Sequence, residues 1–105
     1  MSDAPVWSVV IPTRDRRREL GECLHRLAPG FHTLDAAQYE VVVADDGEFD
    51  ATDVLLRAEF PWTRHVRGPR RGLAANRNAG ARAARGAWIV FADYDVVPSP
   101  GWLAA

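Results

Sequence analysis

Short apolar runs recur along the chain, and segments with a helical period separate them. The runs over residues 7–11 and 39–44 are rich in Val and Ile, which is typical of buried strands. A third such run begins at Trp88 and ends at the carboxylates of Asp93 and Asp95. Residues 64–67 are shorter and more polar, and they predict a strand at a sheet edge. The pattern therefore predicts four strands.

The first intervening segment has the clearest helical pattern. Leu20, Cys23, Leu24 and Leu27 fall at i, i+3, i+4 and i+7, which predicts one buried stripe. We expect Asp15 to cap this helix at its start, and Pro29 lies just beyond its end.

Two further segments also predict helices. Asp50 and Asp53 offer capping chemistry at the start of the second helix, which we expect to end before Pro61. Its expected apolar side consists of Val54, Leu55, Ala58 and Phe60. Residues 72–85 are rich in Ala and predict the third helix.

Alternating strands and helices joined by short links predict a three-layer α/β fold. We expect an open, Rossmann-like sheet of about four parallel strands with helices on both faces. At 105 residues the chain is one domain or part of one. Ser99 and Pro100 resemble a helix start with only a few residues after it, so we expect residues 1–105 to be truncated at the carboxyl end.

Composition excludes several classes of function. Thirteen basic and fourteen acidic residues give a net charge of -1, so no overall field favours nucleic acid. The basic cluster at residues 14–18 has no interleaved aromatic residues and is typical of a solvated helix face. No apolar run approaches the roughly 20 residues that span a bilayer. With no secretory signal and a single, buried Cys23, we expect a cytoplasmic protein.

Acidic residues follow the predicted strands. Asp45 and Asp46 come after the second strand, and Asp93 and Asp95 after the fourth, so they should meet at one edge of the sheet. Oxygen ligands of this kind suit Mg²⁺ or Mn²⁺, whereas the His residues and Cys23 lack zinc-ligand spacing. Asp93 and Asp95 could equally begin an ordinary solvated turn.

Four separated blocks carry a resemblance to a known family. They are the run from Ser8 to Thr13, the run from Tyr39 to Gly47 with residues 50–52, residues 72–80, and residues 86–95 followed by 100–103. In this order they resemble the family 2 glycosyltransferases. The resemblance implies a GT-A fold whose N-terminal half binds a UDP-, GDP- or TDP-sugar. It also implies transfer with inversion, assisted by Mn²⁺ or Mg²⁺.

The resemblance also implies roles for single residues. Asp46, beside Asp45, would accept a hydrogen bond from the nucleobase. Asp93 would lie near the ribose and diphosphate, and Asp95 would bind the metal together with Asp93. The remaining candidates are a turn that would line the base and ribose pocket and a pair that matches the family's Arg-Asn motif: Pro12, Thr13, Arg14 and Asp15 in the turn, and Arg77 and Asn78 in the pair.

The chain departs from the family in two places. Arg14 and Asp15 stand where an aromatic residue and Asn are common, and Glu48 and Phe49 alter the loop after Gly47. Arg14 could stack on the base through its guanidinium or point to solvent. Arg77 could approach the nucleotide or be a helix-surface cation.

We expect the acceptor pocket and the general base to lie beyond Ala105, so no catalytic residue is assigned here. The alternative function is a non-catalytic nucleotide-binding or self-associating module, with homodimers formed through the edge of the fourth strand. A sugar nucleotidyltransferase is disfavoured because no Gly-rich loop follows the first strand. We expect Trp7, Trp88 and Phe91 to be core residues, because they lie within strands.

Overall fold

A computed structural model describes residues 5–28 and 38–92, in which a four-stranded parallel sheet forms the middle layer. The strand order is β3-β2-β1-β4, and each pair of neighbours is parallel. In chain order, the strands are β1 (Trp7–Thr13), β2 (Tyr39–Asp45), β3 (Arg64–Arg67) and β4 (Trp88–Phe91). The predicted parallel sheet and the edge position of β3 are confirmed.

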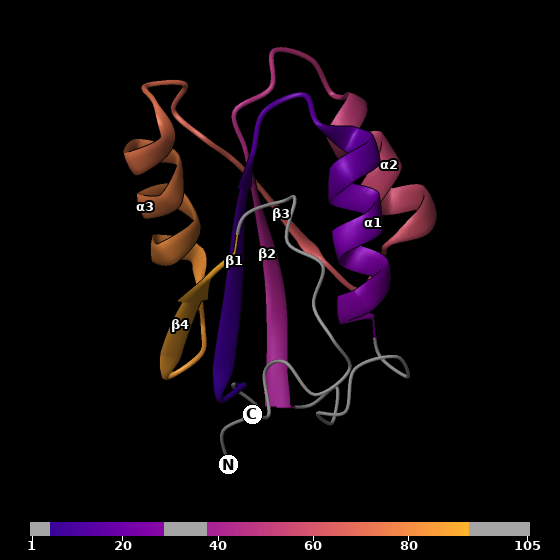
Figure 1. The fold of residues 1–105 in the computed structure, drawn as a ribbon. Coiled ribbons are helices and arrows are strands. Elements are labelled where there is room, and N and C mark those ends of the chain that lie inside the picture. The colour runs from indigo at the N-terminus through magenta and orange to yellow at the C-terminus, as the bar shows by residue number, and fades with distance from the viewer. Residues whose placement is uncertain (1–4, 29–37, 93–105) are drawn as a thin grey trace.

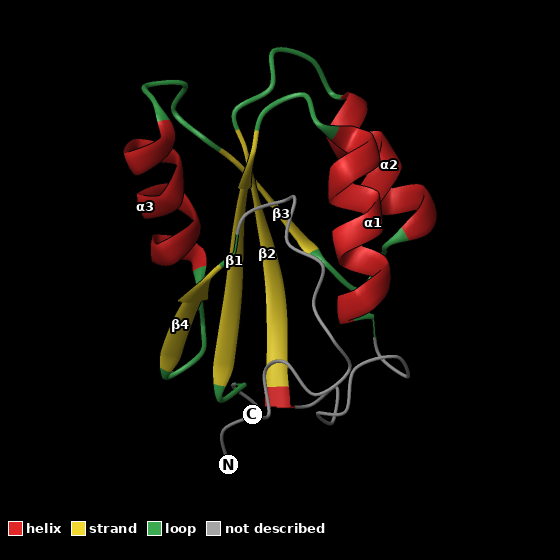
Figure 2. Ribbon diagram, in the orientation of Figure 1, coloured by secondary structure: helices red, strands yellow, loops and turns green. Residues whose placement is uncertain are grey.

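Three helices cover the two faces of this sheet (Figure 1). Helices α1 (Arg17–Leu27) and α2 (Ala51–Glu59) lie on one face, and α3 (Leu73–Ala83) lies on the other (Figure 2). The predicted three-layer α/β fold is therefore confirmed. None of the helices in the described ranges is long and apolar enough to cross a membrane.

The main core lies between the sheet and α1. Alternate residues of the central strands point to this side, and the predicted stripe of α1 packs on them. Cys23 is buried in this stripe as a small apolar residue, as predicted. The fully buried members are Val9, Ile11, Val41, Val43, Leu20, Leu24 and Leu27.

The opposite face of the sheet is packed closely by α3. A Cβ at Gly80 would collide with Val10 Cγ1 and lie 3.3 Å from the Ala44 side chain, so the helix backbone reaches this sheet only because the residue is glycine. The close approach brings the start of α3 to the carboxyl ends of β1 and β2.

A partly buried carboxylate joins α3 to the sheet at the amino end of the strands. The Ser8 hydroxyl donates to Glu40 Oε2 at 2.6 Å, and the Arg85 amide donates to the same oxygen at 2.6 Å. Arg64 Nη1 donates to Glu40 Oε1 at 2.7 Å and to the Ala83 carbonyl at 2.8 Å. Glu40 thus connects β1, β2 and β3 to the end of α3.

Strand β1 runs farther than the sequence predicts. The apolar run predicts a strand over residues 7–11, but Pro12 also pairs with Ala44 and Thr13 with Asp45. Proline removes one donor from a ladder. Since residues alternate in direction, the missing N–H of Pro12 faces the β4 side, where the described pairing ends at Val10 and Phe91. The strand therefore continues to Thr13 without breaking its pairing with β2.

The predicted cap of α1 is wrong, and that of α2 is confirmed in position only. The N-cap of α1 is Arg16, without a side-chain cap hydrogen bond, and Asp15 precedes it in the left-handed region at φ 55°. Asp50 occupies the N-cap position of α2, but its side chain makes no cap hydrogen bond. The expected apolar side of α2 is confirmed for Phe60, which is buried, and for Leu55, which packs against the core. Val54 and Ala58 are exposed instead, and Leu56, one turn before Phe60, is buried.

Strand β4 is not the fully buried strand that its apolar run predicts. Trp88, Ile89 and Phe91 are 64%, 42% and 48% exposed, so the expectation that Trp88 and Phe91 are core residues is wrong. Trp7 is partly buried, and its ring centroid lies 6.4 Å from that of Trp88. The physical reason is position, because β4 is an edge strand and α3 lies mainly over β1 and β2.

Candidate functional site

A cleft of about 310 Å³ opens at the carboxyl ends of β1 and β2, beside the start of α3. Ligands of open α/β sheets bind at this edge. Four predicted site residues line the cleft, together with four residues that the sequence did not indicate. The predicted ones are Pro12, Thr13, Arg14 and Asp46, and the others are Arg16, Gly72, Leu73 and Asn76.

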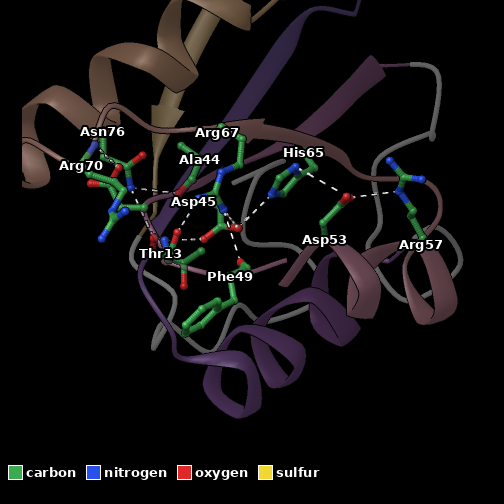
Figure 3. A network of polar contacts seen from close by, with 12 residues as sticks. Thr13, Ala44, Asp45, Phe49, Asp53, Arg57, His65, Arg67, Arg70 and Asn76 are labelled. Atoms are coloured by element: carbon green, nitrogen blue, oxygen red, sulfur yellow. Dashed lines mark hydrogen bonds and ion pairs between the residues drawn. The ribbon is translucent and has the colours of Figure 1, made fainter. Parts of the chain in front are cut away.

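Asp46 lies at the base of this cleft and is held in one orientation. Its side chain and backbone are only 3% exposed. The Asp46 amide donates to the Thr13 carbonyl at 2.9 Å, and Oδ1 accepts from the Arg70 amide at 2.9 Å (Figure 3). Arg70 adopts φ 59°, a left-handed conformation that non-glycine residues rarely take. The backbone turn at Arg70 therefore fixes one carboxylate oxygen of Asp46.

Asn76 reaches the same point from α3. Its Nδ2 donates to the Ala44 carbonyl at 2.9 Å and, at 3.4 Å, to the Thr13 carbonyl (Figure 3). One amide thereby joins the helix to the ends of both central strands. Asn76 and Gly80 are the buried residues of α3 and lie four positions apart, so they share one helix face.

Two polar atoms at the base of the cleft lack partners. Thr13 Oγ1 and Asn76 Oδ1 are buried and make no hydrogen bond with the part of the chain that the structure describes. A buried polar atom without a partner costs about 1–3 kcal/mol. Such atoms indicate a site that a ligand or water completes.

Gly68 is required where Asp46 and Asn76 meet. A Cβ at this position would collide with Oδ1 of Asp46 and with Oδ1 of Asn76. The Gly68 amide also donates to the Asp45 carbonyl at 2.8 Å. The chain therefore passes close to both side chains, and only glycine leaves room for them.

Asp45 is placed differently from its neighbour. It is fully buried, and its carboxylate accepts from the Gly47 amide at 2.8 Å, His65 Nε2 at 2.9 Å and Arg67 Nη1 at 3.1 Å (Figure 3). Arg67 also donates to the Gly47 and Phe49 carbonyls. Asp45 does not line the cleft, and its contacts instead fix the loop that follows β2.

The contacts of Asp45 extend to α2. His65 Nδ1 lies 3.7 Å from Asp53 Oδ1, and Arg57 Nε donates to the same oxygen at 3.1 Å (Figure 3). A carboxylate accepts hydrogen bonds, so the contact with Asp45 favours the His65 tautomer that is protonated at Nε2. The loop after β2 is therefore joined to α2 by a chain of polar side chains.

The remaining predicted site residues lie apart from the cleft or outside the described ranges. The Asp15 carboxylate lies beside Gly47, since a Cβ there would be 2.7 Å from its Oδ1. On α3, Arg77 is partly buried and Asn78 exposed, and neither lines the cleft. Asp93 and Asp95 are outside the described residues.

The described ranges contain no group of three or more His, Cys, Asp or Glu side chains placed to hold a metal ion. The predicted ligands, Asp93 and Asp95, belong to the undescribed part. Asp45 is already surrounded by donors from His65, Arg67 and Gly47.

Comparison with solved structures places the fold. TarS from S. aureus, in complex with UDP-GlcNAc, superposes with a TM-score of 0.78 at 22% identity, covering 93% of this chain and 29% of that one. The mannosyltransferase PcManGT from Pyrobaculum calidifontis, in complex with GDP-Man and Mn²⁺, gives 0.76 at 26% identity, covering 97% and 33%. The architecture is the GT-A, Rossmann-like one.

Three named proteins are similar to this chain in sequence. Chondroitin synthase from Escherichia coli is 35% identical over 91% of this chain and 14% of its own. Validoxylamine A glucosyltransferase from Streptomyces hygroscopicus subsp. jinggangensis is 37% identical over 97% and 25%. Glycosyltransferase AglE from Haloferax volcanii is 30% identical over 97% and 34%.

The chain thus spans between 14% and 34% of the length of these curated relatives. A family model described as Glycosyl transferase family 2 matches residues 8–105. That match includes β1, β2, the cleft and α3. The chain therefore belongs to glycosyl transferase family 2.

Proposed function

We propose that the cleft binds the nucleoside diphosphate part of a nucleotide sugar, and that the chain is the donor-binding part of an inverting glycosyltransferase. The observation that carries the proposal is the base of the cleft. There Asp46 is buried and held by the Arg70 amide, beside the unpartnered Thr13 and Asn76 oxygens. The complexes of the structural neighbours with UDP-GlcNAc and GDP-Man support the same ligand class.

The walls of the cleft suit a nucleoside. Pro12 and Leu73 supply apolar surface for a planar base, and Asp46 supplies an acceptor for a base N–H group. One oxygen of Asp46 is already fixed by the Arg70 amide, so the carboxylate is oriented before the ligand arrives. In this proposal Pro12 and Thr13 line the base and ribose, whereas Asp15, Arg77 and Asn78 lie outside the lining of the cleft and are assigned no contact with the nucleotide.

A divalent ion belongs to the proposal through residues outside the described ranges. Asp95, with Asp93, would hold Mn²⁺ or Mg²⁺, and the ion would supply positive charge to the diphosphate leaving group. The Mn²⁺ in the PcManGT complex supports this assignment. Transfer to an acceptor hydroxyl also requires a general base, which we assign to no residue of this chain.

Titration calorimetry with UDP, GDP and TDP, with and without Mn²⁺, tests the proposal. We expect at least one nucleotide to bind, and Asp46→Ala to weaken it by tenfold or more, about the value of a hydrogen bond to a charged group. Asp50→Ala is the matched control, because Asp50 is exposed and its side chain makes no cap hydrogen bond. Absence of binding with all three nucleotides would refute the proposal.

The exposed β4 edge favours a second, compatible role in self-association. Trp88, Ile89 and Phe91 present apolar surface on an edge strand, which is a template for pairing with another chain. We propose that two copies associate there. Light scattering should show a dimer that Ile89→Lys dissociates, and a stable monomer at high concentration would count against it.

A further inference from the structure

Two arginines at the mouth of the cleft are not used by the base-binding residues. Arg14 and Arg16 follow β1, line the cleft and are exposed. Asp15 stands between them, but its carboxylate lies beside Gly47 and is not part of the lining. Asp15 has a left-handed backbone conformation. The cleft is therefore lined by the positive side chains of Arg14 and Arg16 but not by the Asp15 carboxylate between them in the sequence.

These two arginines differ from others of the chain in their pairing. Arg18, Arg57, Arg64 and Arg67 each pair with a carboxylate. Within residues 5–28 and 38–92, Arg14 and Arg16 have neither an ion pair nor a side-chain hydrogen bond. Their guanidinium groups are thus available to an anionic ligand in the cleft.

The chemistry of the proposed ligand matches this pair. The diphosphate of a nucleotide sugar carries two negative charges, and guanidinium groups bind phosphate oxygens through paired N–H donors. With the base on Asp46 at the bottom of the cleft, the phosphates leave toward its mouth. Arg14 and Arg16 are exposed in the lining of the cleft, and their two positive charges match the two negative charges of the diphosphate.

We propose that Arg14 and Arg16 bind the donor diphosphate directly, so that part of the nucleotide affinity does not require the divalent ion. This inference rests on the proposed function, because it assumes that a nucleotide occupies the cleft. It assigns the arginines to the phosphates and not to stacking on the base. It also predicts that salt weakens binding, since exposed charges are screened.

The test is a pair of titrations of the chain in EDTA. Calorimetry measures the binding of UDP, GDP and TDP, and NMR measures the binding of uridine, guanosine and thymidine. Variants are Arg14→Gln, Arg16→Gln and the double variant. We expect each single change to weaken diphosphate binding about tenfold and to leave nucleoside binding unchanged. Arg18→Gln is the matched control, since Arg18 lies on α1, 88% exposed, and pairs with Glu22.

Four results would overturn the inference. Equal losses for nucleosides and diphosphates would assign the arginines to the base, and an equal loss in Arg18→Gln would indicate a general field effect. Binding seen only with Mn²⁺ would remove the metal-independent component and leave the proposed function standing. Binding of no nucleotide in either condition would refute both.

Discussion

Each end of the parallel sheet carries a carboxylate, buried at Asp46 and partly buried at Glu40, but the contacts of the two differ. At the amino end, both oxygens of Glu40 are occupied by donors from Ser8, Arg64 and Arg85. At the carboxyl end, Asp46 lines an open cleft, next to two buried oxygens without partners in the described chain. A saturated network joins secondary structure elements, whereas an unsaturated one indicates a place for a ligand.

The difference also appears in which elements the contacts join. Glu40 connects three strands to the end of α3, so its loss should loosen the fold. The contacts of Asp46 are a strand carbonyl and the Arg70 amide, which orient one side chain. We therefore expect mutations at the two ends to separate stability from nucleotide binding.

The largest effect on binding should come from Gly68→Ala. The new methyl group collides with Asp46 and Asn76 together, so both side chains must move. We expect nucleotide affinity to fall about a hundredfold, and the free energy of unfolding to fall by about 1–3 kcal/mol from overpacking. Calorimetry measures the affinity, and urea unfolding measures the free energy of unfolding.

Gly21→Ala is the control for Gly68→Ala. The nearest atoms to its new Cβ would be those of the Phe60 ring at 3.9 Å, an ordinary contact. Within α1, alanine should stabilise the helix by up to about 1 kcal/mol. Nucleotide binding by Gly68→Ala equal to that of Gly21→Ala would contradict the assignment of the cleft.

Asn76→Ala should have the next largest effect on binding. The change removes the donor to the Ala44 carbonyl and releases α3 from the strand ends. We expect about a tenfold loss of affinity and a loss of about 1–3 kcal/mol in unfolding free energy. The exposed Asn78 is the comparison, and a greater loss of affinity in Asn78→Ala would favour the residue that the sequence motif indicated.

Glu40→Gln should show the opposite balance. It removes the charge that Arg64 and the Arg85 amide contact, at a distance from the cleft. We expect the unfolding free energy to fall by about 1–3 kcal/mol, with nucleotide affinity unchanged within the error of calorimetry. An affinity loss without destabilisation would break the comparison.

We also expect the contribution of Glu40 to stability to depend on pH. Burial opposes ionisation of Glu40, but hydrogen bonds from Ser8, Arg85 and Arg64 outweigh it and hold the pKa of this carboxyl below its usual 4.5. A lowered pKa contributes stability above pH 4.5 that is lost as the pH falls through the folded-state pKa. The stability difference between the wild type and Glu40→Gln should shrink below pH 4.5, and a constant difference would refute this.

The smallest effect should come from Arg57→Gln. Arg57 pairs with Asp53 within α2, but its side chain is 81% exposed. We expect a change of less than about 0.5 kcal/mol in unfolding free energy, because solvent screens such a pair. A larger change would show that the polar chain from Asp45 through His65 contributes more than its exposed end suggests.

Most of the fold could be predicted because local patterns determined it. The strands, the stripe of α1 and the edge position of β3 follow from periodicity and polarity. The exposure of β4 does not, since an apolar run looks the same in a central strand and at an edge. The caps failed because the backbone of Asp15 turns left-handed and its side chain goes to Gly47.

The site was only partly predictable. Acids after strands indicated Asp46, but they indicated Asp45 equally, and only the tertiary contacts of His65 and Arg67 separate the two. Asn76 was not among the predicted site residues, because the family motif indicates the Arg-Asn pair that follows it. A close contact between helix and sheet requires the glycine at position 80. Asn76 lies four residues before Gly80 on the same helix face, and this spacing was the signal that could have indicated it.

The central claim is tested most directly by measuring nucleotide affinity and unfolding free energy in Asp46→Asn and Glu40→Gln. Asparagine keeps an oxygen for the Arg70 amide, so Asp46→Asn should remain within about 1 kcal/mol of wild-type stability while affinity falls tenfold or more. Glu40→Gln should lose stability and keep affinity. Wild-type affinity in Asp46→Asn, together with weakened binding in Glu40→Gln, would contradict the account.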